Sequence, residues 1–208
     1  MRAKDKKNST ATEALCAATT TAALQKYRLA RPMCGACPSF GKRWACPPFD
    51  AQNAPNFETR KYANLAAVKI KPSNPQLAPK EIIDQARETI DEIFYGIEKL
   101  LPNATLALAG SCLCPHADKC PRTRGAPCAR PDKMRASLEA ANYDVVKIAK
   151  DILQTDILWQ TAGKQPPYFT LAYCVFADIE APEKIAAALA ENLEGCNAKI
   201  LGGQQRPQ

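Results

Sequence analysis

The chain has 208 residues, of which 46% are hydrophobic and 24% are charged, an ordinary balance for a globular protein with one well-filled core. No apolar run has the length of a membrane span, and the polar start with the Thr/Ala-rich stretch up to Leu24 makes a poor signal-peptide core. We therefore expect a cytoplasmic protein with no membrane partner. In that reducing compartment, ten cysteines indicate metal or redox chemistry and not disulfides.

The net charge of +7 is concentrated around two groups of cysteines. Residues 26–46 carry +5, residues 115–135 carry +4, and the N-terminal residues 1–10 add +3. Nearby cations lower thiol pKa values and stabilise an anionic iron–sulfur cluster. A solvated basic surface is the ordinary alternative. No nucleic-acid motif accompanies the charge, so nucleic acid is a disfavoured partner.

The first part of the chain is predicted as a tail, a helix and a loop. Residues 1–10 are charged and polar, and we expect them to be disordered. Residues 12–29 are predicted as a helix, although their threonines weaken its helix propensity. Residues 31–55 hold too many Pro and Gly for regular structure, which predicts a loop folded around its own cysteines.

A strand–helix–strand unit follows this loop. Apolar residues alternate with lysines at the end of residues 65–71, which predicts a strand. Residues 80–101 carry apolar side chains at helical spacing, and residues 105–109 form a short apolar strand. This order predicts parallel strands joined by a right-handed crossover. The second cysteine segment, residues 110–135, then leaves the carboxyl end of a strand, where open α/β sheets commonly bind ligands.

The remaining pattern predicts helices at 137–141, 145–153 and 182–193, a buried strand at 169–176, and a disordered end at 201–208. We therefore predict an α/β or α+β fold, a small mixed sheet with packed helices. Two irregular, cysteine-rich metal-binding loops, 31–55 and 110–135, belong to the same single domain, which spans residues 11–200.

Three cysteines of the first loop are candidate ligands of one metal centre: Cys34, Cys37 and Cys46. A two-residue gap lets the first two sulfurs point at the same centre. Proline follows directly after Cys37 and Cys46, which fixes the backbone and removes N–H donors near sulfur. Three aromatic residues are expected to form an apolar wall that keeps water out: Phe40, Trp44 and Phe49.

Four more candidate ligands lie in the second loop: Cys112, Cys114, Cys120 and Cys128. Seven thiolates are one short of the eight that two 4Fe–4S clusters need. The eighth ligand would then be His116 (the only histidine), Cys174, water or a substrate. One cluster, or one zinc ion bound by four of the seven thiolates, is the alternative.

The cysteine motifs resemble a known family. The first motif is Cys34-x2-Cys37-Pro38-x-Phe40-Gly41-x2-Trp44-x-Cys46-Pro47-Pro48-Phe49. The second comprises Gly110-Ser111-Cys112, Cys120, Cys128-x2-Pro131 and Ser137-Leu138-Glu139-Ala140. Over about residues 27–145, these motifs resemble a prokaryotic domain-of-unknown-function family of predicted metal-binding proteins. The resemblance implies a cysteine-bound metal and no particular reaction. The spacing from Cys112 to Cys128 departs from the two-residue gaps of that family.

Glu139 is a carboxylate that follows the second cysteine group closely in the sequence. It follows Ser137, which is expected to cap the helix predicted at 137–141, so its negative charge would lie in the first turn. Capping alone is a sufficient explanation for this residue.

These patterns favour a protein that binds one or two 4Fe–4S clusters and transfers electrons, or gives redox support to a partner protein. The Cys-Pro steps, the aromatic residues and the local positive charge favour iron over zinc. Two alternatives remain open: a structural zinc-binding module without catalysis, and an enzyme that uses an open iron site of a cluster. No nucleotide-binding glycine loop or nucleophile–histidine pair is present, so the sequence assigns no reaction.

Overall fold

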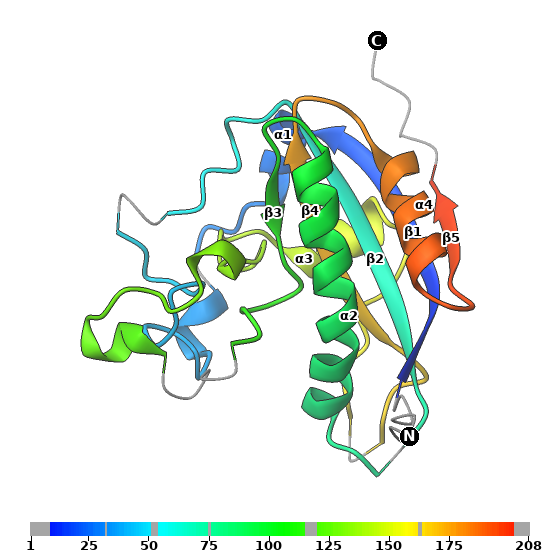
Figure 1. The fold of residues 1–208 in the computed structure, drawn as a ribbon, viewed down its shortest axis with the longest axis horizontal. Coiled ribbons are helices and arrows are strands. Elements are labelled where there is room, and N and C mark those ends of the chain that lie inside the picture. The colour runs from blue at the N-terminus through cyan, green and yellow to red at the C-terminus, as the bar shows by residue number, and fades with distance from the viewer. Residues whose placement is uncertain are drawn as a thin grey trace, which may run out of the picture.

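The computed structural model describes residues 9–31, 33–50, 54–74, 76–114, 120–161 and 164–201. Its centre is a mixed five-stranded sheet in the order β3-β4-β2-β1-β5 (Figure 1). The strands are β1 (Ser9–Thr20), β2 (Tyr62–Pro72), β3 (Thr105–Ala107), β4 (Phe169–Ala177) and β5 (Asn197–Ile200). The pairing of β1 with β5 is parallel, and the other three pairings are antiparallel. The predicted mixed sheet with helices is confirmed, in an α+β arrangement.

The helix predicted for residues 12–29 is wrong, because most of this segment is the strand β1. Its side chains alternate between the two faces of the sheet: Ala14 and Cys16 belong to one hydrophobic core, and Leu15 and Ala17 belong to the other. Four threonines favour extended backbone here. Pairing with β2 on one side and β5 on the other outweighs the helix propensity of the alanines.

The predicted strand–helix–strand unit exists as β2, α2 (Pro79–Leu100) and β3. Both strands pair antiparallel with β4, so they run in the same direction, as predicted. They are not neighbours, however, because β4 lies between them, which makes the unit a split β-α-β motif. The second cysteine loop leaves the carboxyl end of β3, as the sequence predicted.

Three other helices are present in the described residues: α1 (Thr21–Leu24), α3 (Val145–Asp151) and α4 (Pro182–Asn192). The predictions for residues 145–153 and 182–193 are thereby confirmed. The helix predicted for residues 137–141 is wrong, because this segment forms consecutive turns. Asn142 at the end of these turns has φ +70°, in the left-handed region, and five residues are too few to sustain an isolated helix.

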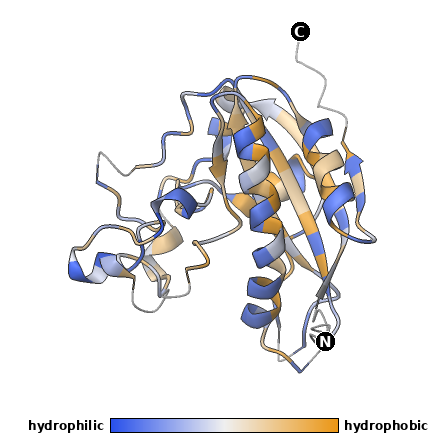
Figure 2. Cartoon of the chain, in the orientation of Figure 1, coloured by the Kyte–Doolittle hydropathy of each residue, from blue (hydrophilic) through white to orange (hydrophobic). Residues whose placement is uncertain are grey.

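The sheet is buried on both faces. On one face pack α2 and α4, with the Phe94 ring stacked on Tyr173 at a centroid distance of 4.1 Å. On the other face pack α1, α3 and the irregular segment around Tyr143. Figure 1 shows α2 and α4 in front of the sheet and α3 behind it. The strands between these layers are mostly apolar, whereas α2 carries both polar and apolar residues (Figure 2).

The two cysteine loops lie together beside the sheet and not within either core (Figure 1). Their described parts contain short 3-10 turns and no longer regular element: η2 (Met33–Ala36), η4 (Pro121–Arg124) and η5 (Pro131–Lys133). Most of both predicted terminal tails lies outside the described residues. None of the helices in the described ranges has the length and apolar character needed to cross a membrane.

Candidate metal centre

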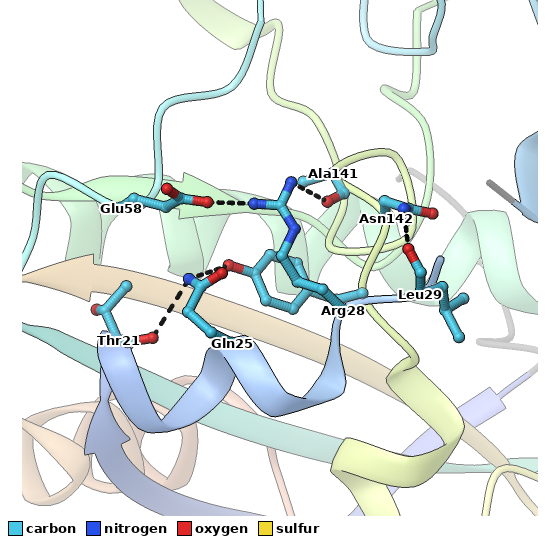
Figure 3. A network of polar contacts seen from close by, with 8 residues as sticks. Thr21, Gln25, Arg28, Leu29, Glu58, Ala141 and Asn142 are labelled. Atoms are coloured by element: carbon cyan, nitrogen blue, oxygen red, sulfur yellow. Dashed lines mark hydrogen bonds and ion pairs between the residues drawn. The ribbon is translucent and has the colours of Figure 1, made fainter. Parts of the chain in front are cut away.

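The two cysteine loops share a common base. The residues that enter the first loop pair with those that leave the second: Leu29 N–H donates to Asn142 O at 2.9 Å, and Asp144 N–H donates to Tyr27 O at 2.8 Å. Arg28 adds side-chain contacts to Glu58 and to the Ala141 carbonyl, as Figure 3 shows. The start of the first loop and the segment after the second loop, more than a hundred residues apart in sequence, are therefore hydrogen-bonded to each other.

Gln25 and Asn142 extend this network. The Gln25 side chain donates to the Tyr143 hydroxyl at 3.0 Å, and the Asn142 amide donates to Leu29 O at 2.5 Å (Figure 3). Tyr143 is 1% exposed, so this polar network is anchored on the core behind the sheet. The turns at 137–141 thus serve to close the base of the loops, which explains why they do not form the helix that the sequence predicted.

Arg122 and Trp44 hold the two loops against each other. The Arg122 guanidinium donates to three carbonyls of the first loop: those of Arg43 (2.7 Å), Cys46 and Pro48. It also lies over the Trp44 ring, at 5.5 Å from the centroid. In return, Trp44 Nε1 donates to Ala126 O of the second loop at 3.0 Å. These contacts bring both cysteine groups together, which sequence spacing did not reveal.

Replacing Arg122 with methionine is expected to lower the free energy of unfolding by about 2–3 kcal/mol, because three carbonyls lose a charged donor. Denaturant unfolding of metal-free protein measures this loss, and amide exchange in both loops should accelerate. Arg124→Met is the matched control. Arg124 is exposed in the same turn and makes no side-chain contact with the described residues, so a change below about 0.5 kcal/mol is expected. Equal effects of the two substitutions would contradict the role of Arg122.

Helix α2 holds the end of the second loop. The Tyr95 hydroxyl donates to Lys133 O at 2.7 Å, and Lys133 Nζ lies 2.5 Å from Glu92 Oε2. Arg135 Nε forms an ion pair with Glu98 Oε1 at 2.9 Å. The polar face of α2 is therefore covered in part by the loop and is not simply a solvated surface.

A cavity of about 660 Å³ lies between the second loop, the first loop and α2, and we call it the cysteine cavity. All four cysteines of the second loop line it, together with Arg43 and Trp44 of the first loop. The wall formed by α2 consists of charged residues and one tyrosine: Lys80, Asp84, Arg87, Glu88, Asp91, Glu92 and Tyr95.

The thiols of the first loop differ in exposure. Cys46 is 9% exposed, Cys34 is half-buried and Cys37 is exposed. Burial raises the pKa of Cys46 to about 11; Arg43 opposes this rise, while the neighbouring thiols of Cys112, Cys37 and Cys34 add to it. Cys46 therefore lies within electrostatic range of its own group and of the second loop.

In the second group, the thiol of Cys112 is affected by burial and by Arg43 in the same way as that of Cys46. Burial raises its pKa, Arg43 again lowers it, and the thiols of Cys114, Cys120 and Cys128 raise it. Arg43 therefore favours the ionised form of one thiol in each loop, Cys46 and Cys112. The sequence predicted a cationic environment for the cysteines, and Arg43 is one cation that provides it.

The predicted aromatic wall is only partly present. Trp44 lines the cysteine cavity, but Phe49 packs against the core behind the sheet and Phe40 is 37% exposed. Phe49 and Phe40 are therefore in other surroundings and do not shield the cavity. Aromatic shielding gives less support to iron over zinc than the sequence alone indicated.

Glu139 contacts the first cysteine group through its backbone. Its backbone carbonyl accepts a contact from Cys34 Sγ at 3.5 Å. The residue is half-buried, yet burial of its carboxyl group raises its pKa, while its own backbone N–H, the Ser137 hydroxyl and Arg87 oppose the rise. Ser137 Oγ accepts from Ala140 N–H at 3.2 Å, so it caps a turn, as expected, although the turn does not continue as a helix.

A buried ion pair underlies the cavity. Arg87 Nη2 lies 2.9 Å from Asp91 Oδ2, and their side chains are only 5% and 6% exposed. The fully buried Tyr173 hydroxyl donates to Asp91 Oδ1 at 2.7 Å. The sequence placed Arg87 and Asp91 on the polar face of a helix, but loop and sheet enclose them. Their i, i+4 spacing was the available signal for the pair.

Gly110, which begins the second loop, lies directly above this pair. Its φ of +98° is in the left-handed region that favours glycine. A Cβ atom at this position would lie 3.5 Å from Arg87 Nη1. Gly110 therefore lies beside the Arg87 guanidinium, and Cys112, two residues later, lines the cavity.

A family model described as "Predicted metal-binding protein (DUF2284)" matches residues 20–172. The chain belongs to this family. The match covers more than half of the chain and includes both cysteine loops, the common base and the cysteine cavity. The family to which the cysteine motifs pointed is thus confirmed. No curated protein and no solved structure matches the chain.

Membership in the DUF2284 family supports metal binding. The cysteine thiols that line the cavity are donors of a type that binds metals. Thiolates are the preferred ligands of zinc and of iron–sulfur clusters. Among the residues that the structure describes, no group of three or more His, Cys, Asp or Glu side chains is arranged around a single point. The four thiols of the second loop line the cavity, whereas Cys34, Cys37 and Cys46 are not part of its lining. The donor set therefore fits a metal in chemical type, but its spacing among the described residues does not form a complete site.

The remaining candidate ligands lie elsewhere. His116 falls in residues 115–119, outside the described part of the chain. Cys16 and Cys174 are fully buried in the two cores, and Cys196 lies beside β5. None of these three cysteines belongs to either cysteine loop, so the seven loop cysteines remain the candidate ligands.

Proposed function

We propose that this DUF2284 protein binds one or two 4Fe–4S clusters through the thiolates of its two cysteine loops. The observation that carries the proposal is the direct contact between the two cysteine loops, in which Arg122 donates to three carbonyls of the first loop and Trp44 Nε1 donates to Ala126 O of the second. A cluster held by thiolates is a net anion, and a neighbouring guanidinium stabilises it. A bound cluster would supply a one-electron redox centre.

The protein's own contribution is to bring the sulfurs together and to set their environment. Arg122 and Trp44 fix the relative position of the loops, and the pairing at residues 27–29 and 142–144 closes their base. Half-buried thiols lose part of their hydration, while Arg43 offsets the cost of ionising them. Cys37 is exposed, so a partner protein has access to the edge of the first group.

The role that fits this arrangement is electron transfer, or redox support of a partner enzyme, in the cytoplasm. The exposed edge at Cys37 supports contact with a redox protein. The cysteine cavity favours a second candidate, an enzyme that binds a substrate at an open iron site, because four thiols line a space of about 660 Å³. A structural zinc site is the third, since zinc takes the same ligands.

Purification without oxygen, followed by iron, zinc and acid-labile sulfide analysis with an absorption spectrum, tests this proposal. We expect iron and sulfide in equal amounts, and a broad absorption band near roughly 400 nm, because thiolate-bound iron absorbs there and zinc does not. A colourless protein with zinc and no sulfide would overturn the cluster and support the zinc module. A protein with neither metal would overturn both.

A further inference from the structure

The cysteine cavity has two unlike walls, and a metal centre accounts for only one of them. A metal lies about 2.3 Å from its thiolate sulfurs, so a cysteine-bound centre would lie against the loop wall. The opposite wall, formed by α2, contains no cysteine and presents charged side chains. A volume of about 660 Å³ is within the usual range of small-molecule sites, roughly 300–1,000 Å³.

Arg87 gives the α2 wall a fixed cationic group. Its Nε and Nη2 atoms contact the Asp91 carboxylate, at 3.4 and 2.9 Å. Asp91 is held in turn by the Tyr173 hydroxyl. The third guanidinium nitrogen, Nη1, makes no hydrogen bond with Asp91 and lies beside Gly110, while Arg87 itself lines the cavity. A side chain only 5% exposed therefore offers a donor whose position is set by its neighbours.

Stability alone does not explain this ion pair, since burying two charges costs about as much free energy as their attraction returns. Apolar residues of similar volume would pack in the same place without that desolvation. Burial raises the pKa of Asp91, with Arg87 and Tyr173 opposing the rise, which expresses the same desolvation. A binding role at the cavity floor accounts for retaining the pair.

Arg43 faces the cavity from the first loop and has no carboxylate partner within the described residues. Its Nη1 donates to the Ser111 hydroxyl at 2.9 Å. Arg130, at the exposed rim, has neither an ion pair nor a side-chain hydrogen bond within the described ranges. The lysines of the lining differ, because Lys80 and Lys133 are paired with acidic residues of α2.

We propose that the cysteine cavity binds a small carboxylate-bearing molecule between the cysteine wall and α2, with its carboxylate held by Arg43 and Arg87. A guanidinium fork matches a planar carboxylate with two parallel hydrogen bonds. Among the described lining residues, after the ion pairs are discounted, two cations (Arg43 and Arg130) and one acid (Glu88) remain, so the excess positive charge is small. That balance suits an anion of low charge and disfavours polyphosphates. The site depends on these cations and not on a bound cluster.

Calorimetric titration at constant ionic strength tests the proposal on metal-loaded and on metal-free protein. The probes are acetate, malonate and citrate, with phosphate and sulfate as inorganic anions. We expect saturable binding of at least one carboxylate and weaker binding of both inorganic anions. Arg43→Gln should weaken that binding roughly tenfold to a hundredfold, because a charge-assisted pair is lost. Arg130→Gln should have a smaller effect in the same direction.

Two matched substitutions control for a general loss of positive charge. Lys42 and Arg124 are exposed cations of the same loops and do not line the cavity, so Lys42→Gln and Arg124→Gln should leave the affinity within about twofold. Equal weakening by all four substitutions, tighter binding of phosphate than of any carboxylate, or no saturable carboxylate binding would overturn the proposal.

Metal analysis of the same samples separates this inference from the proposed function. Iron and sulfide without carboxylate binding would overturn the carboxylate site and leave the cluster proposal standing. Carboxylate binding by purified protein that contains neither iron nor zinc would overturn the cluster proposal and leave the carboxylate site standing. Binding that is present with and without metal, and is lost in Arg43→Gln, is the result we expect.

Discussion

Replacing Cys46 with alanine is expected to remove at least one metal centre, and with it half or all of the bound iron and sulfide. Cys46 is the buried thiol of the first loop, and its electrostatic neighbours come from both cysteine groups. A cluster that loses a thiolate ligand is exposed to water and oxygen. Iron and sulfide analysis with the absorption spectrum measures the loss. Because metal binding contributes folding free energy, the thermal midpoint of metal-loaded protein should also fall.

Cys174→Ala is the control for removing a buried sulfur. Cys174 is fully buried in the core behind the sheet and does not line the cysteine cavity. This substitution should lower stability by about 1 kcal/mol through lost packing, without changing the iron content. A normal iron content in Cys46→Ala, or an equal loss in Cys174→Ala, would contradict the assignment of the metal centre to the loops.

Replacing Asp91 with alanine is expected to lower the free energy of unfolding by about 3–5 kcal/mol. The substitution leaves the Arg87 guanidinium buried without its counter-charge, and it leaves the Tyr173 hydroxyl without its acceptor. Denaturant unfolding of metal-free protein measures the loss directly. Asp84→Ala is the matched control on the same helix. Its ion pair with Lys80 is exposed, so a change of no more than about 0.5 kcal/mol is expected.

A double substitution tests whether the Arg87–Asp91 ion pair stabilises the fold, or whether only the loss of one partner is destabilising. Arg87→Met combined with Asp91→Leu replaces both charges by apolar groups of similar volume. The double variant should recover most of the stability lost in Asp91→Ala, because no uncompensated charge remains and only the Tyr173 hydroxyl lacks its partner. If the double variant were as unstable as Asp91→Ala, the pair itself would stabilise the fold, and the argument for its role at the cavity floor would fail.

The scaffold was predictable where local pattern and tertiary packing agree. Residues 80–101 carry a regular apolar stripe, and α2 buries that stripe against the sheet. Residues 169–176 form a nearly continuous apolar run, and β4 is covered on both faces. The prediction failed at β1, where alanine and threonine favour neither state strongly. There the choice depends on pairing with β2 and β5, which are distant in sequence.

The candidate ligands were also predictable, because cysteine spacing is a local property of the chain. Their environment was not. Arg122 and Arg43 are two of many basic residues in the sequence, and only the fold shows which carbonyls and thiols they reach. The same holds for Arg87 and Asp91, whose polar character predicts exposure but which the second loop and β4 enclose. The spacing of the ligands and the identity of the metal remain predictions.

By itself, the sequence determined the family, the seven candidate thiols and the amphipathic scaffold. Each of these depends only on the identity and spacing of residues that are close together in the chain. Tertiary structure alone decided that the two loops meet, that α2 forms the far wall of their cavity, and that a charged pair lies beneath it. Such contacts join residues about 80 or more positions apart, and their formation depends on the free energy of the whole fold and not on any local preference.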